Sequence, residues 1–148
     1  MSLRIRPARP DDAPRLLEVW EGAVRATHHF LGEEDIQFYR GVVRDNYLPT
    51  AELYVAVEPA DRPVGFLGLY ESDIEALFVD PSRHGGGVGR ALLAHATALR
   101  PDLTVSVNEQ NTRARGFYEA MGFREVGRSE TDAEGRPFPL IHMSLVAG

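Results

Sequence analysis

The sequence predicts a single domain of the α/β (α+β) class, and three observations lead to that class. The chain has 148 residues, the size of one ordinary domain and enough for one sizeable core. Segments with the period of a strand alternate along it with segments with the period of a helix, without repeats or low-complexity tracts. A glycine-rich loop then joins a branched, aromatic strand to a strong helical run. We therefore expect residues 1–148 to form one domain.

The N-terminal part of the chain predicts a short strand followed by two helices. Residues 3–6 alternate apolar and basic side chains, and the prolines that follow end this strand. Asp11 or Asp12 then caps a helix that reaches about residue 26, because apolar side chains recur there at spacings of three and four. A second amphipathic helix is expected over 33–47, with an acidic first turn that suits the helix dipole.

The remainder of the chain predicts six strands and two helices. Residues 53–57 and 63–70 indicate an antiparallel hairpin, and residues 74–79 form the strand before the glycine-rich loop. A helix over 89–100, a strand over 103–107 and a helix between residues 111 and 122 follow. Two strands over 124–130 and 140–146 end the chain.

The glycine-rich loop reads Arg-His-Gly-Gly-Gly-Val-Gly-Arg-Ala-Leu-Leu over residues 83–93 and is typical of an anion site. Its glycines allow a tight bend, and its N–H groups together with the start of the next helix can bind a phosphate. Gly89 is followed by Arg90 rather than by lysine and serine or threonine, which excludes a P-loop. The glycine spacing also fails the dinucleotide fingerprint. A turn that merely links strand to helix is the alternative.

The strand before the loop carries two acidic residues. Period-two alternation places Asp73, Glu75, Leu77 and Val79 on one face of this strand and Ile74, Ala76 and Phe78 on the other. A carboxylate on a strand face can remove a proton directly or through water and so serve as a general base. The two carboxylates are candidates for that base. The alternative is that they lie at a solvated strand start.

Residues 27–32, between the two N-terminal helices, contain adjacent histidines and a phenylalanine. Two neighbouring histidines at a helix end point about 100° apart, and no third ligand spacing supports a metal site, so we expect no metal. One histidine packed in the core and one in solvent is the simplest interpretation of this joint. Binding of a substrate is the alternative.

Two motifs resemble those of the GNAT superfamily of acyl-CoA N-acyltransferases. Gly87 and Gly89 match motif A, Gln/Arg-x-x-Gly-x-Gly/Ala, but His84 stands where Gln or Arg is usual, with Arg83 beside it as a substitute. Residues 108–123, Asn-Glu-Gln-Asn-Thr-Arg-Ala-Arg-Gly-Phe-Tyr-Glu-Ala-Met-Gly-Phe, resemble motif B. Residues 20–31 resemble the pattern Trp-x-x-x-Val-x-Ala-Thr-His-x-Phe-Leu of the small bacterial YjaB-like branch.

The resemblance implies a GNAT fold, which is a mixed, mostly antiparallel, splayed sheet of about six to seven strands flanked by about four helices. It also implies acetyl-CoA as the donor substrate and direct transfer of the acetyl group to a primary amine in a ternary complex. A small-molecule amine is expected rather than a protein amine. A module that binds or senses acyl-CoA without turning it over is the alternative function.

The resemblance also assigns roles to individual residues. Tyr118 is the candidate acid for the leaving thiolate, with a core aromatic as the alternative, and Asp73 or Glu75 is the candidate base. The residues expected to contact coenzyme A are Leu77, Phe78, Val79, Arg83, His84, Gly85, Gly86, Gly87, Val88, Gly89, Arg90, Asn108, Asn111, Phe117 and Tyr118. The residues expected to contact the acceptor are Trp20, Thr27, His28 and Phe30.

Composition limits the partners further. The net charge of −6 argues against nucleic acid, and no apolar run approaches the roughly 20 residues of a membrane span or forms a signal segment. We therefore expect a cytoplasmic monomer or homodimer. The chain has no cysteine, so the acyl group cannot be held on a thiol. All 16 basic residues are arginine, so the enzyme cannot acetylate side-chain amines of its own.

Overall fold

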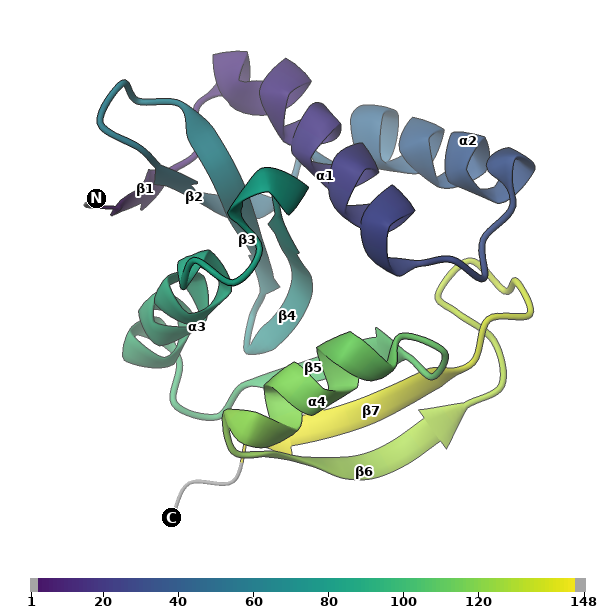
Figure 1. Cartoon of the computed structure of the whole chain (residues 1–148). Coiled ribbons are helices and arrows are strands. Elements are labelled where there is room, and N and C mark those ends of the chain that lie inside the picture. The colour runs from purple at the N-terminus through teal and green to yellow at the C-terminus, as the bar shows by residue number, and fades with distance from the viewer. Residues whose placement is uncertain (1–2, 146–148) are drawn as a thin grey trace.

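A computed structural model describes residues 3–145, whose backbone forms a seven-stranded mixed sheet with four α-helices (Figure 1). The strands are β1 (Arg4–Pro7), β2 (Glu52–Val57), β3 (Pro63–Tyr70), β4 (Asp73–Val79), β5 (Thr104–Asn108), β6 (Phe123–Ser129) and β7 (Leu140–Leu145). The α-helices are α1 (Ala13–Thr27), α2 (Glu33–Val42), α3 (Val88–Leu99) and α4 (Thr112–Ala120). The strand order is β1-β2-β3-β4-β5-β7-β6, and the sheet is antiparallel except between β4 and β5. The predicted mixed, mostly antiparallel fold is confirmed.

The sheet divides into two parts between β4 and β5, which lie parallel for only a short distance. Asp73 pairs with Thr104 and Ile74 with Val105, and beyond these two pairs the strands separate. Figure 1 shows the resulting divergence of β4 from β5. Because the strands do not pair further along, the facing backbone N–H and C=O groups of both strands need other partners there.

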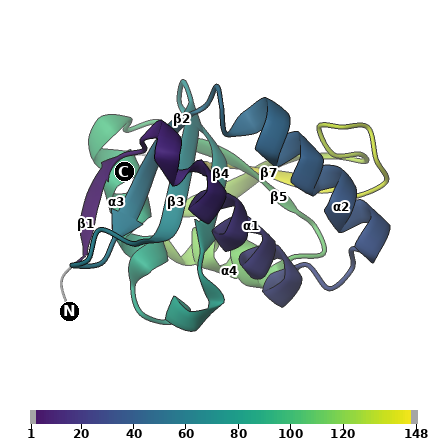
Figure 2. The same ribbon diagram turned by 90° about the horizontal axis from the view of Figure 1, so that it is seen from above.

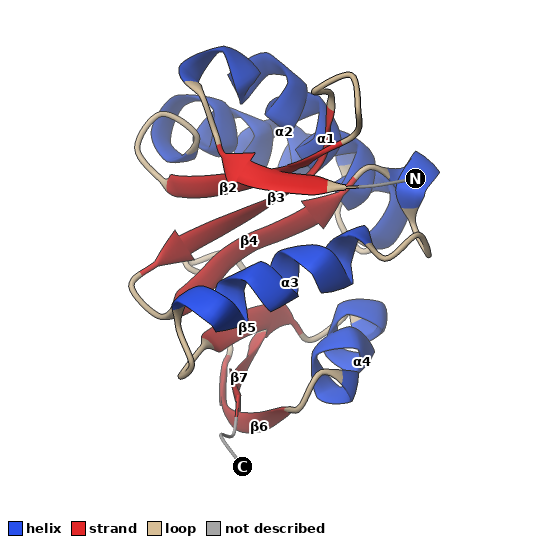
Figure 3. Ribbon diagram, turned by 90° about the vertical axis from the view of Figure 1, so that its left-hand side faces the viewer, coloured by secondary structure: helices blue, strands red, loops and turns tan. Residues whose placement is uncertain are grey.

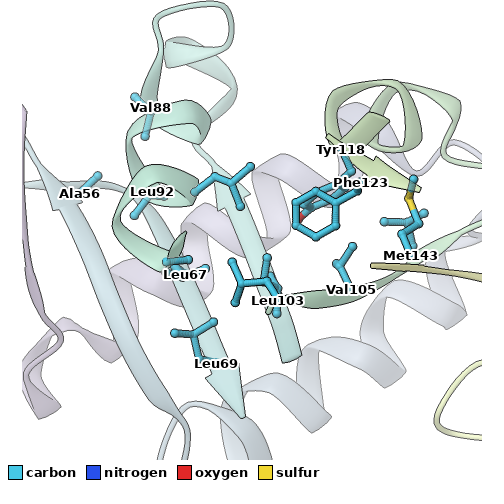
Figure 4. Close-up of a cluster of buried hydrophobic side chains, with 14 of the residues drawn as sticks. Ala56, Leu67, Leu69, Val88, Leu92, Leu103, Val105, Tyr118, Phe123 and Met143 are labelled. Atoms are coloured by element: carbon cyan, nitrogen blue, oxygen red, sulfur yellow. The ribbon is translucent and has the colours of Figure 1, made fainter. Parts of the chain in front are cut away.

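Helices cover the first part of the sheet on both faces. Helix α1 lies across β3 and β4 with α2 beside it (Figure 2), and α3 packs on the opposite side of these strands (Figure 3). Alternate residues of β3 feed the two cores, since Leu67 packs with α3 and Phe66 packs with α1. Helix α4 packs on β5 and β6 and completes the core on the α3 side (Figure 4). Among residues 3–145, no helix is long and apolar enough to cross a lipid bilayer.

The second predicted helix reaches its expected end, but its last turn is wider than an α-helix. Helix α2 continues into a π-helical segment, Val43–Tyr47, and the chain turns at Leu48 and Pro49. A π segment is rare, and it often accompanies a functional site. Here it places Tyr47 against the core on the α1 side of the sheet.

The prediction of strict alternation along β4 was wrong because the strand contains a β-bulge. Gly68 pairs with Ala76 and Leu69 pairs with Ile74, so Glu75 is an extra residue opposite β3. As a result Ile74 packs in the same cluster as Leu77, on the α3 side, rather than with Ala76. Because of the bulge, strict alternation along the strand does not predict the direction of the Glu75 side chain.

Asp12 lies at the start of α1 as predicted, but its carboxylate does not cap that helix. It accepts two hydrogen bonds from the Arg6 guanidinium, at 2.9 and 3.1 Å, and one from the backbone N–H of Arg9 at 2.7 Å. The side chains of Arg6 and Asp12 are both only 10% exposed, and Asp61 forms a second ion pair with Arg6. This pair therefore ties β1 to the start of α1.

We predict that Asp12→Asn lowers the free energy of unfolding by about 2 kcal/mol or more, because it leaves a buried guanidinium without its main partner. Urea unfolding at pH 7 measures this, and Asp11→Asn, an exposed neighbour, serves as the control. Arg6 lowers the pKa of Asp12 below 3.8, so the contribution is present above that pH and is lost as the pH falls further. Equal stability of the two variants at pH 7 would contradict the prediction.

Candidate active site

A cavity of about 500 Å³ occupies the space where β4 and β5 separate. Its wall consists of the end of α1, residues 74–79 of β4, most of the glycine-rich loop, residues 105–108 of β5, and the start of α4. The cavity therefore joins the loop predicted to bind an anion to the strand predicted to carry a base. Both expected halves of the site lie on one continuous surface.

The glycine-rich loop ends in the first turn of α3. Gly85 and Gly87 have φ values of +81° and +85°, and Gly87 is the residue that precedes the helix. The N–H groups of residues 88–90 have no acceptor within the helix, as at any helix start. Because these residues line the cavity, this end of it is suited to an anionic group such as a phosphate.

The two side chains expected to contact the pyrophosphate, Arg83 and His84, are held by other groups. The Arg83 guanidinium donates to both carboxylate oxygens of Glu58, at 2.6 and 2.9 Å. The His84 ring lies 3.0 Å from the carbonyl oxygen of Val79 through Nε2. Both residues line the cavity, but they support the loop rather than present a free cation.

Two other arginines supply positive charge to the cavity. Arg90, which we predicted, and Arg113, which we did not, both line it. Neither forms an ion pair with a carboxylate of the described residues. Arg113 lies inside the motif B stretch, but sequence alone does not show which arginines lack a partner. These two guanidiniums suit an anionic ligand.

Tyr118 satisfies both interpretations considered from the sequence. Its ring is 5% exposed and packs edge-on against Phe123 (Figure 4). It also packs edge-on against Phe117, and the ring centroids are 5.2 Å apart in both pairs. The residue also lines the cavity, and its hydroxyl has no hydrogen-bond partner within residues 3–145. Burial, with a smaller contribution from the charge of Asp73, raises the pKa of the Tyr118 hydroxyl above 10. The hydroxyl therefore keeps its proton at neutral pH.

The structure distinguishes the two carboxylates of β4. Glu75, at the bulge, lines the cavity, and burial together with the charge of Asp73 raises the pKa of Glu75. Asp73 accepts a hydrogen bond of 2.7 Å from the Thr104 hydroxyl and does not line the cavity. A raised pKa makes a carboxylate a stronger base, so Glu75 is the better placed of the two.

His28 is a half-buried, neutral histidine at the end of α1. The Thr27 hydroxyl donates to the carbonyl oxygen of Ala23, so it accepts from Nδ1 of His28 at 2.8 Å. Nε2 is then an acceptor, and it faces the Asn111 amide at 3.4 Å. Burial, followed by the charge of His29, lowers the pKa of His28 to about 4. An unfolded histidine titrates near 6.5, so between pH 6.5 and about 4 the unfolded chain binds a proton at this position that the folded chain does not. The free energy of unfolding therefore decreases as the pH falls from 6.5 toward 4.

The other residues expected to contact the acceptor lie in different surroundings. Thr27 lines the main cavity beside His28, whereas Phe30 lines a second, smaller cavity between the end of α1 and the start of α4. The Phe30 ring lies 5.9 Å from that of Phe138, in the loop between β6 and β7. Trp20 is 5% exposed in the core under α1 and does not line the cavity. The structure thus gives Trp20 a packing role.

Sequence reasoning missed Ser106, which also lines the main cavity. Its hydroxyl lies 2.7 Å from Nδ1 of His142, and Ser129 contacts the other ring nitrogen, so three strands share this hydrogen-bonded row. The row depends on the register of β5, β7 and β6. No local sequence signal indicates that these three residues are neighbours.

Residues 49–125 match the acetyltransferase (GNAT) domain family. Among solved structures, the PaiA N-acetyltransferase of Thermoplasma acidophilum in complex with coenzyme A has the same fold, with a TM-score of 0.81, 20% identity, and coverage of 99% of this chain and 100% of that one. The chain belongs to the GNAT acetyltransferase family, whose members use acetyl-CoA.

Full-length relatives place the chain more closely within this family. It is 44% identical to the peptidyl-lysine N-acetyltransferase YjaB of Escherichia coli K12 over 146 residues. This alignment covers 99% of each chain. The solution structure of apo-form YjaB from Escherichia coli has a TM-score of 0.93 and covers 100% of both chains. The peptidyl-lysine N-acetyltransferase YiaC of E. coli K12 is 32% identical over 143 residues, covering 96% of this chain and 97% of YiaC. The chain is thus an N-acetyltransferase, and the resemblance to the YjaB-like branch is confirmed.

We predict that Gly87→Ala weakens coenzyme A binding tenfold or more, because φ at this position is +85° and a Cβ there favours a different loop conformation. Gly116→Ala is the matched control, since Gly116 lies on the exposed face of α4 with nothing within 4 Å of an added Cβ. Calorimetric titration of coenzyme A into both variants measures the difference. Equal affinities in folded variants would move the phosphate site away from this loop.

Proposed function

We propose that this chain transfers the acetyl group of acetyl-CoA directly to the side-chain amine of a lysine in a peptide or protein, as a single domain of residues 1–148. The observation that supports this most strongly is one cavity that joins the glycine-rich loop, Glu75 and Tyr118. An anion site, a base and a hydrogen-bond donor to the leaving sulfur are three groups that assist acetyl transfer from a thioester to an ammonium group.

The donor is proposed to lie with its phosphates at the start of α3 and its thioester between β4 and β5. The loop N–H groups, Arg90 and Arg113 balance the phosphate charge. The separated strands leave backbone groups of β4 and β5 without a strand partner, and these are proposed to bind the amide groups of the pantetheine arm, as residues 77–79 were expected to do. The Val79 carbonyl oxygen already contacts His84. A backbone N–H near the thioester also polarises its carbonyl group.

The acceptor amine is proposed to lose its proton to Glu75, directly or through water. A protonated amine has no lone pair with which to attack the carbonyl carbon, so the proton must leave first. The attack forms the N–C bond, the C–S bond breaks, and coenzyme A leaves as its thiolate. The acetylated nitrogen then loses its second proton, which passes to the thiolate or to water. Glu75 holds the proton that the amine lost before the attack.

Tyr118 is proposed to donate a hydrogen bond to the departing sulfur. Its pKa is raised above 10, whereas a thiol has a pKa near 8.5, so complete proton transfer to the thiolate is unfavourable at equilibrium. A hydrogen bond from a neutral hydroxyl to developing negative charge in a buried site still stabilises the transition state. Tyr118 therefore acts mainly by stabilising charge.

The relatives' names bear on the acceptor. YjaB and YiaC are both named peptidyl-lysine N-acetyltransferases, which favours a protein amine over the small-molecule amine that we expected from the sequence. The chain contains no lysine itself, so acetylation of its own side chains cannot compete with the substrate. The cytoplasmic location and the monomeric or dimeric state stay predictions.

Release of coenzyme A thiol tests the function against the alternative of a module that only binds acyl-CoA. The purified chain is incubated with acetyl-CoA and lysine-containing peptides, with matched peptides in which lysine is replaced by arginine, and with small amines. We expect lysine-dependent thiol release and acetylated peptide by mass spectrometry, and at least tenfold less of both with Glu75→Gln. Binding of acetyl-CoA without release in any mixture would support the binding module.

We predict that Tyr118→Phe lowers kcat about 100-fold while leaving the melting temperature and coenzyme A affinity nearly unchanged, because the ring packing remains and only the hydroxyl is lost. Steady-state kinetics and thermal unfolding of the same preparation measure both effects. A decrease in kcat of less than threefold would remove the proposed role of the hydroxyl, and a large loss of stability would make Tyr118 a core residue only.

A further inference from the structure

Tyr47 carries a buried hydroxyl that has no hydrogen-bond partner within residues 3–145. It is the last residue of the π-helical segment that follows α2, and it packs on the core on the α1 side of the sheet. A buried hydroxyl without a partner is unfavourable, so such groups are uncommon unless a water or ligand completes them. The mechanism described above does not use this hydroxyl.

The adjacent strand leaves a space for this hydroxyl. A Cβ added at Gly68 of β3 would lie 1.8 Å from the Tyr47 hydroxyl oxygen, so no other residue fits there without moving the tyrosine. Gly68 pairs with Ala76, directly beside the bulge at Glu75. The glycine and the π segment therefore place the hydroxyl over Gly68, whose strand partner Ala76 directly follows the bulged Glu75.

The charge of Glu75 acts on the Tyr47 hydroxyl. Burial raises the pKa of Tyr47 most, and the negative charges of Glu75 and then Asp73 raise it further. The tyrosine therefore stays protonated and is a hydrogen-bond donor at any pH at which the enzyme works. No hydrogen bond joins Tyr47 to Glu75 within residues 3–145, and the Glu75 side chain is exposed.

We propose that the Tyr47 hydroxyl donates a hydrogen bond to the Glu75 carboxylate, directly or across one water molecule, and so positions the base that receives the proton of the acceptor amine. This inference rests on the proposed function. Tyr47 acts through Glu75 and does not contact the reacting atoms, so it is a positioning residue. The bond fixes the carboxylate and stabilises its charged form, which is the form that accepts the proton.

The other titratable groups near Glu75 act differently. Asp73, on the same strand, disfavours the Glu75 charge. His28, from α1, lines the same cavity but is neutral above about pH 4. His142, on β7, reaches the cavity wall through Ser106 of β5. Tyr47 differs from these groups, because its hydroxyl is neutral, can donate a hydrogen bond and has no partner within residues 3–145.

The test compares Tyr47→Phe with the wild-type chain in two measurements. Carbon-13 NMR titration of the Glu75 carboxyl group in the free protein needs no turnover, and we expect the variant to raise its pKa by about one unit, because a donor to the charged form is lost. In peptide acetylation, we expect kcat/KM to fall about fivefold to tenfold near pH 6, with a smaller loss at high pH and the acid limb moved upward. An unchanged Glu75 titration would overturn the inference, whether or not any acceptor is acetylated.

Further variants separate positioning from packing. Tyr70→Phe removes an exposed hydroxyl at the end of the same strand, β3, and should leave both measurements unchanged. Gly68→Ala should displace the Tyr47 hydroxyl and reproduce the effects of Tyr47→Phe with the tyrosine still present. In a Glu75→Gln background, Tyr47→Phe should cause no further loss of activity. A uniform loss of activity across pH with a lower melting temperature would instead assign Tyr47 to packing and overturn the proposal.

Discussion

The short pairing of β4 with β5 is the constraint on which the site depends. Two residue pairs hold the halves of the sheet together, and the strands then diverge around the main cavity. Helices α3 and α4 pack on the two halves, and Leu92 of α3 and Phe123 of β6 belong to one continuous core that fixes the halves relative to one another. The gap is therefore built into the fold, and backbone groups at its edges remain available to a ligand.

Charge is distributed along this gap according to what each end is proposed to bind. The start of α3 presents unpaired N–H groups, and Arg90 and Arg113 lie on the same cavity wall. Glu75 and the neutral His28 also line this cavity, and burial lowers the pKa of His28 so that its ring does not compete for a proton at neutral pH. In the proposed reaction, donor phosphates and an acceptor cation would thus meet opposite charges, and the uncharged Tyr118 would face the sulfur on which negative charge develops.

Departures from regular secondary structure concentrate around Glu75. The β-bulge on β4, the glycine at position 68 and the π-helical segment ending at Tyr47 come from three separate parts of the chain. Each is locally unfavourable or uncommon, and regular alternatives exist for each. The bulge is at Glu75, Gly68 pairs with the residue after it, and the Tyr47 hydroxyl lies against Gly68. Proteins retain such irregular geometry where function, rather than stability, selects it.

The sequence by itself determined the order of the elements, the fold class, the glycine-rich loop and the motif that carries Tyr118, because hydrophobic period, glycine conformation and helix caps are local properties. Only the tertiary structure decided which groups are free. It showed that Arg83 is engaged by Glu58 and that Trp20 is buried in the core. It also revealed the β-bulge at Glu75, which the sequence could not predict because strand register depends on partners far away in the chain. Hydrogen-bond partners and burial arise from contacts between distant segments, and no local pattern encodes them.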